Sequence, residues 1–269
     1  MWLERKRRLR PATERTDRRV VRNLGIAGLS AVAVQLAERP VILPVARWVE
    51  RRRRGLLFAL EGRAFGRRLR AAMALILLDY TLYLWHVLEH RSQLLYRFHI
   101  VHHADLDLDA STAVRFHFGE LLASIPWRAA QVIVLGITPR ELSMWQRWLL
   151  ASILFHHSNI RLPLAVERVL SRVIMTPRLH GIHHSIVAEE QSSNWSSGLA
   201  IWDFLHGTYR ANVPQDAIEI GVPAFREPSQ VSFARSIAHP FGPQPAWTYP
   251  DGRVPVRSAL PHSTITLET

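Results

Sequence analysis

The apolar residues of this chain are gathered in blocks rather than in evenly spaced stripes, a pattern typical of helices that contact lipid. Residues 71–85 form the clearest block and predict one helix. Residues 121–137 and 142–155 form two more blocks, separated only by 138–140. Two helices joined by so short a turn form a hairpin, which returns the chain to the side of the membrane that it left.

A fourth apolar region lies nearer the start of the chain. Its two pieces, 24–37 and 41–49, are interrupted by Glu38, Arg39 and Pro40. Neither piece has the roughly 20 residues of a simple membrane span, so the pair is interpreted as one kinked span, a re-entrant hairpin or a secretory signal. The charged segment is too long and the apolar core too short for a typical signal. About four membrane-embedded segments therefore predict an all-α, integral-membrane helical bundle.

The remaining segments are polar. Segment 1–22 is an Arg-rich arm, which we expect to be poorly ordered or to lie on a membrane surface. Segment 23–70 holds the first apolar region and a second arginine block. Segment 211–269 is polar and rich in proline, and it predicts a soluble cap with little regular structure.

The net charge of +12 comes from two blocks. Residues 1–22 carry nine Lys and Arg against three acids, and residues 47–70 carry nine Arg against two acids. These blocks flank apolar segments, as juxtamembrane arginines do, so we exclude nucleic acid as a partner. If 71–85 crosses the membrane fully, the second block and the histidines that follow lie on opposite sides, and the positive-inside rule cannot place both in the cytoplasm. A partial or re-entrant insertion removes that conflict.

Histidine supplies the candidate chemistry. Five of the fourteen histidines fall within residues 86–103, and the chain has no cysteine. His86 and His90 are four residues apart, and two triplets repeat an i, i+3, i+4 spacing, so each group shares one face of a helix. The triplets are His99, His102 and His103, and His180, His183 and His184. So many imidazoles exceed what one ion binds, so the pattern predicts two metals, and imidazole with open positions suits O2 activation by iron.

These groups, in this order, resemble those of the sterol desaturase and fatty acid hydroxylase superfamily of integral-membrane, non-haem di-iron enzymes. Four further segments are similar to superfamily motifs: 77–90 to the aspartate-bearing helix before the first histidine box, 111–120 to T-x-x-R-x-H-P-x-E, 155–160 to H-S-N, and 194–210 to the closing N-[YF]-G…W-D-x-x-F-G-T-[YF] signature. The resemblance covers about residues 69–210. It implies a catalytic domain at residues 71–210.

Three positions depart from the superfamily pattern. Val87 stands where arginine is usual, Phe118 where proline is usual, and His206 where phenylalanine is usual. None of the three removes a ligand. The departures leave the substrate and the subfamily open.

The resemblance implies a set of site residues. Its metal ligands, which would also be the catalytic residues, are His86, His90, His99, His102, His103, His157, His180, His183 and His184. His117 is a candidate tenth ligand, with a helix-capping role as the alternative, and we expect His156 to pack beside His157. Six polar residues are expected to orient imidazoles by hydrogen bonds to the free ring nitrogens: Asp79, Arg115, Glu120, Asn159, Asn194 and Asp203. For Asp79, a structural hydrogen bond within the bundle is the alternative.

The resemblance further implies an O2-dependent oxidoreductase with two Fe ions that hydroxylates or desaturates a lipid C–H bond in lipid biosynthesis or modification. The substrate is either sterol-like or a fatty-acyl, carotenoid or ether lipid. A non-catalytic membrane protein that binds or transports metal is the alternative from another class. Because no flavin or nicotinamide motif is present, we expect an external electron donor, namely a reductase, a ferredoxin or a cytochrome. We expect the protein in a bacterial inner membrane, with the histidine boxes facing the cytoplasm.

Overall fold

The computed structural model describes residues 2–61 and 66–257. Within these ranges the chain forms helices and three isolated β-bridges but no β-strand, which confirms the predicted all-α class. The α-helices are α1 (Trp2–Lys6), α2 (Thr16–Ala33), α3 (Arg39–Arg52), α4 (Leu56–Ala59), α5 (Arg67–Arg91), α6 (Gln93–His103), α7 (Phe118–Leu135), α8 (Pro139–His157), α9 (Leu164–Leu170), α10 (Pro177–His183), α11 (Ala188–Gln191), α12 (Ile201–His206) and α13 (Phe233–Ala238). The π-helix η1 (Val34–Glu38) and the 3-10 helices η2 (Thr112–Val114), η3 (Gln215–Ala217) and η4 (His239–Phe241) complete the described part.

The first apolar region is one continuous stretch of helix rather than two helices folded into a hairpin. Helices α2 and α3 are joined through η1 without a break, because the residues at both junctions, Val34 and Glu38, keep helical backbone angles. Pro40 is the second residue of α3, so its missing N–H falls where the helix changes from the π to the α pattern. The wider turn of the π-helix η1 lets the helix continue past Glu38, Arg39 and Pro40, the residues that interrupt the apolar region in the sequence.

The predicted hairpin is present as α7 and α8. Helix α7 ends at Gly136, whose φ of 78° is left-handed, and α8 begins with a capping box between Thr138 and Glu141. Arg70, in the first turn of α5, donates from Nε to Glu141 Oε1 at 2.8 Å and from Nη2 to the Gly136 carbonyl at 2.7 Å. The start of α5 and the turn of the hairpin therefore lie at the same end of the bundle.

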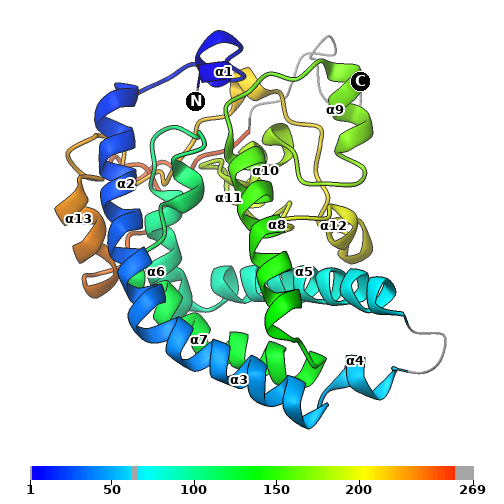
Figure 1. Cartoon of the computed structure of the whole chain (residues 1–269). Helices are drawn as coiled ribbons and strands as arrows, with labels where there is room; N and C mark the ends of the chain where they lie inside the picture. Colours follow the sequence, from blue (N-terminus) through cyan, green and yellow to red (C-terminus); the bar gives the residue numbers. More distant parts are fainter. Residues whose placement is uncertain (1, 62–65, 258–269) are drawn as a thin grey trace.

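Helices α3, α5, α7 and α8 enclose the main apolar core, which includes Ile42, Leu78, Val132 and Trp145. Helix α3 packs against α7 (Figure 1). Three stretches of helix are long and apolar enough to cross a membrane: Thr16–Ala59, Arg67–Arg91 and Phe118–Leu135. The fourth expected segment is helical, as α8, but with Arg147 exposed on its surface it is not among these candidate spans.

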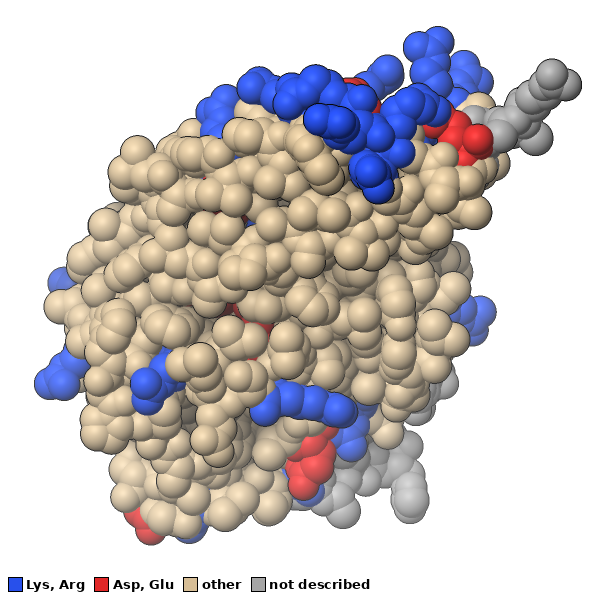
Figure 2. All heavy atoms as spheres, turned by 90° about the horizontal axis from the view of Figure 1, so that it is seen from below, with Lys and Arg blue, Asp and Glu red and all other residues tan. Residues whose placement is uncertain are grey.

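The outer face of the bundle carries few charges, and large apolar side chains such as Leu36, Ile76 and Val134 are exposed on its helices. Figure 2 shows a broad face with few charges and a group of basic side chains along one edge. Arginines 51–54, 67 and 68 are all exposed. His86 follows Arg70 on the same helix by sixteen residues, about 24 Å. The second arginine block and the histidines therefore lie at opposite ends of α5.

The N-terminal arm differs from the expectation of a poorly ordered or membrane-surface segment. It forms α1, the first turns of α2 and, between them, an extended strap that contacts Ile160 and the first residue of α10, Pro177 (Figure 1). The backbone N–H of Leu9 donates to the Asn159 carbonyl at 2.9 Å, and the Asn159 side chain donates to the Arg10 carbonyl at 2.9 Å. The arm is ordered because its arginines find buried carboxylate and carbonyl partners, which composition alone does not reveal.

Candidate metal centre

All nine histidines that the resemblance implies as ligands come together in two groups. In each group, one ligand atom per residue lies within 4.8 Å of the others. One group is His86, His90, His99, His103 and His183, and the other is His102, His157, His180 and His184. The rings come from the ends of α5, α6, α8 and α10, and the i, i+3, i+4 spacing sends members of one triplet to different groups.

The group of four has the dimensions of a metal site. His157 Nε2 lies 3.0 Å from both His102 Nε2 and His180 Nε2, and His184 Nε2 lies 3.1 Å from His180 Nε2. With metal–nitrogen bonds of about 2.1 Å, neighbouring ligand atoms around one ion are roughly 3 Å apart. The Nε2 atoms thus converge as ligands of a single ion do.

The group of five is equally close-packed. Ring centroids of His86 and His183 are 4.6 Å apart, and those of His90 and His103 are 4.7 Å apart. Among the described residues, Nε2 of His90, His99 and His183 has no hydrogen-bond partner. A buried nitrogen without a partner costs roughly 1–3 kcal/mol, so several in one place indicate a site that is completed by metal ions.

Burial keeps these imidazoles neutral. It lowers the pKa of His183 to about 3 and lowers the pKa of His180 and His184 well below the ordinary value of 6.5. Neighbouring histidines lower the last two further. At neutral pH each ring therefore offers a lone pair, which is the form that binds a metal.

Backbone carbonyls orient several of the rings. His86 Nδ1 donates to the Trp195 carbonyl at 2.6 Å, and His183 Nδ1 donates to the Ser193 carbonyl at 2.9 Å. His157 Nδ1 donates to the Ile153 carbonyl at 2.8 Å. Each bond places the proton on Nδ1 and leaves Nε2 to face its group. Sequence reasoning missed these partners because carbonyls carry no residue-type signal.

Among the six polar residues expected to orient imidazoles, Glu120 has a direct contact, with Oε1 3.1 Å from His99 Nδ1. Asp79 takes the structural alternative instead, since Oδ2 accepts hydrogen bonds from Leu199 N at 2.9 Å and Trp202 Nε1 at 2.8 Å. Asp79 lies two turns before His86 on α5 and packs against Leu199 and Trp202, so it does not reach the imidazoles that it was expected to orient.

Asn194 and Asp203 form hydrogen bonds that fix the loop of residues 193–199. Asp203 accepts from the N–H groups of Trp195 and Ser196, at 2.8 and 3.0 Å. Asn194, with a φ of 53°, donates from Nδ2 to the carbonyls of Leu179 and Arg210. These side chains hold the loop whose carbonyls orient His86 and His183. Asn194 and Asp203 therefore orient the imidazoles through this loop and not by the direct hydrogen bonds that we expected.

Arg115 and Asn159 face away from the histidine rings. Arg115 donates from Nε to the Val101 carbonyl at 2.9 Å and from Nη1 to Asn23 Oδ1 at 2.8 Å, and so ties α6 to α2. Asn159 binds the N-terminal arm through Arg10. Both positions therefore support the frame of the site.

His117 lies outside both groups. Its Nδ1 accepts from Gly119 N at 2.9 Å, as the N-cap of α7, and its Nε2 lies 3.3 Å from the Ile237 carbonyl. This is the helix-capping alternative. His156 is fully buried, with its ring 4.6 Å from that of His157 and 4.1 Å from that of His180, and it belongs to neither group.

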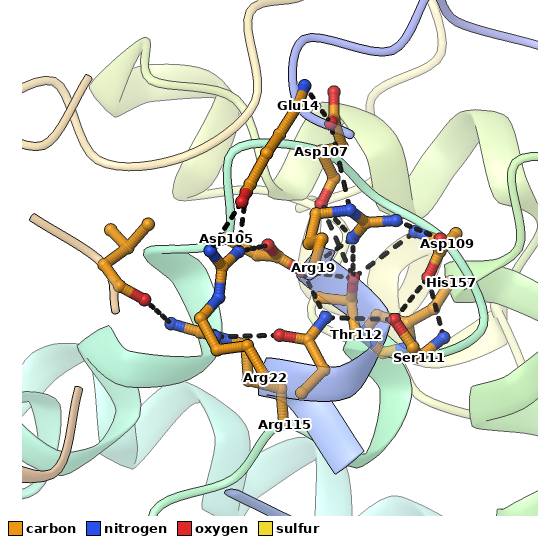
Figure 3. Close-up of polar contacts among 12 residues, drawn as sticks. Glu14, Arg19, Arg22, Asp105, Asp107, Asp109, Ser111, Thr112, Arg115 and His157 are labelled. Carbon is orange, nitrogen blue, oxygen red and sulfur yellow. Dashed lines mark hydrogen bonds and ion pairs between the residues drawn. The ribbon is translucent and has the colours of Figure 1, made fainter. Parts of the chain in front are cut away.

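Sequence reasoning also missed a buried network behind the group of four. Figure 3 shows Arg19, from α2, between Asp105 and Asp109 of the loop after α6. Burial alone would raise the pKa of Asp105, but the guanidinium groups of Arg19, Arg115 and Arg22 outweigh it and lower that pKa to about 2. The alternating acids of 105–109 were the available signal, because a buried arginine needs such partners.

Glu89 is a further buried carboxylate that the sequence did not single out. Its Oε2 lies 3.8 Å from His99 Nδ1, on the side of that ring where Glu120 also lies. Glu89, His99 and Glu120 thus form a third cluster of metal-binding residue types. Its position one residue before His90 was the available signal.

A cavity of about 230 Å³ opens beside the histidines, between α5, α7 and α8. His86, His102 and His157 are among the histidines that line one part of it, and Leu82, Leu121, Leu149 and Ile153 line the apolar part. A cavity that joins a metal centre to apolar walls suits an apolar substrate.

Fold and site together define an integral-membrane helical protein with a histidine-built candidate metal centre. Residues 71–208 match the family model described as fatty acid hydroxylase, and the chain belongs to this family.

Two curated relatives are similar to this chain. An ornithine lipid hydroxylase, OlsE, from Rhizobium tropici is 32% identical over 56% of this chain and 44% of its own length. A cholesterol 25-hydroxylase-like protein from Danio rerio is 30% identical over 51% of this chain and 54% of its own length. The chain thus spans about half the length of each relative. No solved structure matched it.

Proposed function

We propose that this protein is a lipid hydroxylase that uses O2 and two iron ions to insert an oxygen atom into a C–H bond of a membrane lipid. The convergence of nine histidines into two groups beside an apolar cavity is the observation that carries the proposal. Family membership and the hydroxylase names of both relatives support it. The donor set also fits, because imidazole binds iron well and the described residues offer no thiolate alternative.

The chain's own residues have three tasks in this reaction. The nine histidines would hold the two ions through neutral ring nitrogens, and the Trp195 and Ser193 carbonyls fix two of the rings. The apolar wall around Leu121 and Leu149 holds the lipid and excludes water. Iron, when bound, supplies the O2 activation that an unreactive C–H bond needs.

The overall balance requires two electrons. One oxygen atom of O2 enters the lipid as a hydroxyl group, and the other leaves as water with two protons and two electrons. We propose that an external reductase, ferredoxin or cytochrome supplies the electrons. The histidine cap, by which we mean the end of the bundle that holds the nine histidines together with segment 211–257 packed there, would then face the cytoplasm, where reduced carriers are available.

The direct test is metal content with a matched histidine control. Protein purified in detergent from iron-supplemented cells should contain about two irons per chain. His102→Ala should lose iron and turnover together, whereas His239→Ala, which lies outside both groups, should keep both. Incorporation of one ¹⁸O atom from ¹⁸O2 into a lipid would identify hydroxylation. A His102→Ala protein that keeps full iron and activity would overturn the proposal.

A further inference from the structure

A polar stripe follows one face of α7 inside an otherwise apolar span. Glu120, Ser124 and Arg128 are spaced four residues apart, so they share one helical face, and all three line the cavity. Glu120 is at the end near His99. Arg128 lies eight residues further along, about 12 Å into the candidate membrane span.

The contacts of Arg128 leave part of its guanidinium group available, with Cζ of that group 6.0 Å from the centroid of the Trp145 ring. Its Nε donates to Ser124 Oγ at 3.2 Å, and among the described residues it has no other side-chain hydrogen bond. Nη1 lies 3.5 Å from Glu38 Oε1 in η1, which is an ion pair longer than a typical charged hydrogen bond. The Arg128 side chain is 22% exposed, compared with 6% for Glu38. The N–H groups of Arg128 that have no partner within the described part of the chain therefore belong to a side chain that lines the cavity.

A cation at this depth is costly unless it has a function. Arginines within membrane spans usually face a bundle interior or a cavity and mark a substrate or ion site. The planar guanidinium group pairs with carboxylate or phosphate oxygens in a two-point geometry. The two carboxylates that line the cavity, Glu89 and Glu120, lie beside His99, whereas Arg128 lies about 12 Å from Glu120 along α7. The Arg128 end of the cavity therefore fits the anionic group of an amphiphile, with its apolar body along the leucines.

We propose that Arg128 is an anion-binding subsite, so that the preferred substrates are lipids with a carboxylate or phosphate group. This inference rests on the proposed function, and it deepens it by naming the substrate class. With the anionic group at Arg128, the apolar body extends along Leu121 and Leu149 toward the histidines. The distance between Arg128 and the ligands then selects which carbon is presented for reaction.

The test compares two probes of the same chain length, one with an anionic and one with a neutral head group. Binding of myristate and of 1-tetradecanol is measured by calorimetry on zinc-loaded protein in detergent, at a pH where the carboxylate is ionised. Wild-type protein should bind myristate at least tenfold more tightly. Arg128→Leu should lose this preference while it still binds tetradecanol, and Arg128→Lys should keep part of it. Arg147→Leu, on the exposed face of α8, should keep all of it.

A second variant separates anion binding from a merely structural ion pair. Glu38→Gln breaks the pair but leaves the cation, so the preference for myristate should persist or increase. Loss of the preference in Glu38→Gln to the same degree as in Arg128→Leu would overturn the inference. So would a wild-type protein that binds both probes equally. The double variant Glu38→Gln/Arg128→Leu, which leaves no unpaired buried charge, controls for folding.

Two further outcomes name the source of the anion and separate this inference from the proposed function. Tighter binding of 1-myristoyl lysophosphatidic acid than of myristate would support a phospholipid head group, and the reverse order a free fatty acid. The assay needs no turnover. An iron-loaded, active enzyme without charge preference would refute the subsite alone, whereas wild-type protein without stoichiometric metal would refute the proposed function alone.

Discussion

The loop 193–199 controls the histidine rings through main-chain atoms. Its carbonyls at Ser193 and Trp195 accept hydrogen bonds from His183 and His86, and its own N–H groups are held by Asp203. Gly198 lies directly against the carboxylate of Asp79, where a Cβ would overlap Oδ1. The position of the rings thus depends on a close approach between α5 and this loop.

Gly198→Ala should therefore weaken the metal site without touching a ligand. The added methyl group pushes Asp79 away from Leu199 and Trp202, so the loop shifts and His86 loses its carbonyl partner. We expect a loss of about 2–4 kcal/mol in stability and reduced iron content. Thermal unfolding and metal analysis check both.

Gly28→Ala is the matched control for this substitution. Gly28 lies within α2, and a Cβ there meets nothing within 4 Å. The change should raise stability by roughly 0.5–1 kcal/mol, because alanine favours a helix more than glycine does. Equal behaviour of the two variants would contradict the role given to the loop.

At the scale of elements, the apolar blocks predicted α5 and the α7–α8 hairpin. This prediction was possible because a helix that contacts lipid needs a run of apolar residues, and such a run can be seen in the sequence. Histidine spacing predicted which histidines belong to one site, but not that each triplet is divided between the two groups. The N-terminal arm could not be predicted in this way, since its order comes from partners far along the chain, such as Asp105 and Asn159. The carbonyls that orient the rings escaped prediction for the same reason.

Arg19 of α2 and Asp105 of the loop after α6 form an ion pair at 2.8 Å that is almost fully buried. Asp105→Asn should cost about 3–5 kcal/mol, because it leaves a buried guanidinium group without its full charge partner. The folded pKa of Asp105, about 2, is below its ordinary value of 3.8, so its stabilising effect is present above about pH 4 and is lost as pH falls through about 2.

Thermal unfolding of both proteins between pH 7 and pH 2 measures this effect. The wild-type midpoint should fall more steeply than that of Asp105→Asn below pH 4, so that the two curves converge. Parallel curves would show that Asp105 is not the titrating group.

At the scale of the whole molecule, the arginines of 51–54 and the histidine cap lie at opposite ends of α5, about 24 Å apart from Arg70 to His86. That length is shorter than the roughly 30 Å hydrocarbon core of a bilayer. The positive-inside rule favours the cytoplasm for the exposed arginines, and the proposed electron supply favours it for the cap. Partial insertion of the bundle from the cytoplasmic side satisfies both.

Because the chain has no cysteine, single cysteines can map this arrangement. Ser229→Cys marks the cap and Ala59→Cys the arginine end, and both positions are exposed. Both should resist a membrane-impermeant maleimide in intact bacterial spheroplasts and react after lysis. Labelling of Ala59→Cys alone before lysis would show that the helices cross fully, and labelling of Ser229→Cys would refute a cytoplasmic cap.

The strap formed by the arm also bears on the order in which the molecule folds. The α7–α8 hairpin forms between neighbours in sequence, whereas Arg10 pairs with Gln215, 205 residues away, and Glu4 pairs with Asn159, 155 residues away. Contacts that close such long loops form slowly, and only after the distant partner has been synthesised. We therefore expect the membrane hairpin to form early and the strap to dock late, after residues 159 and 215 have been synthesised.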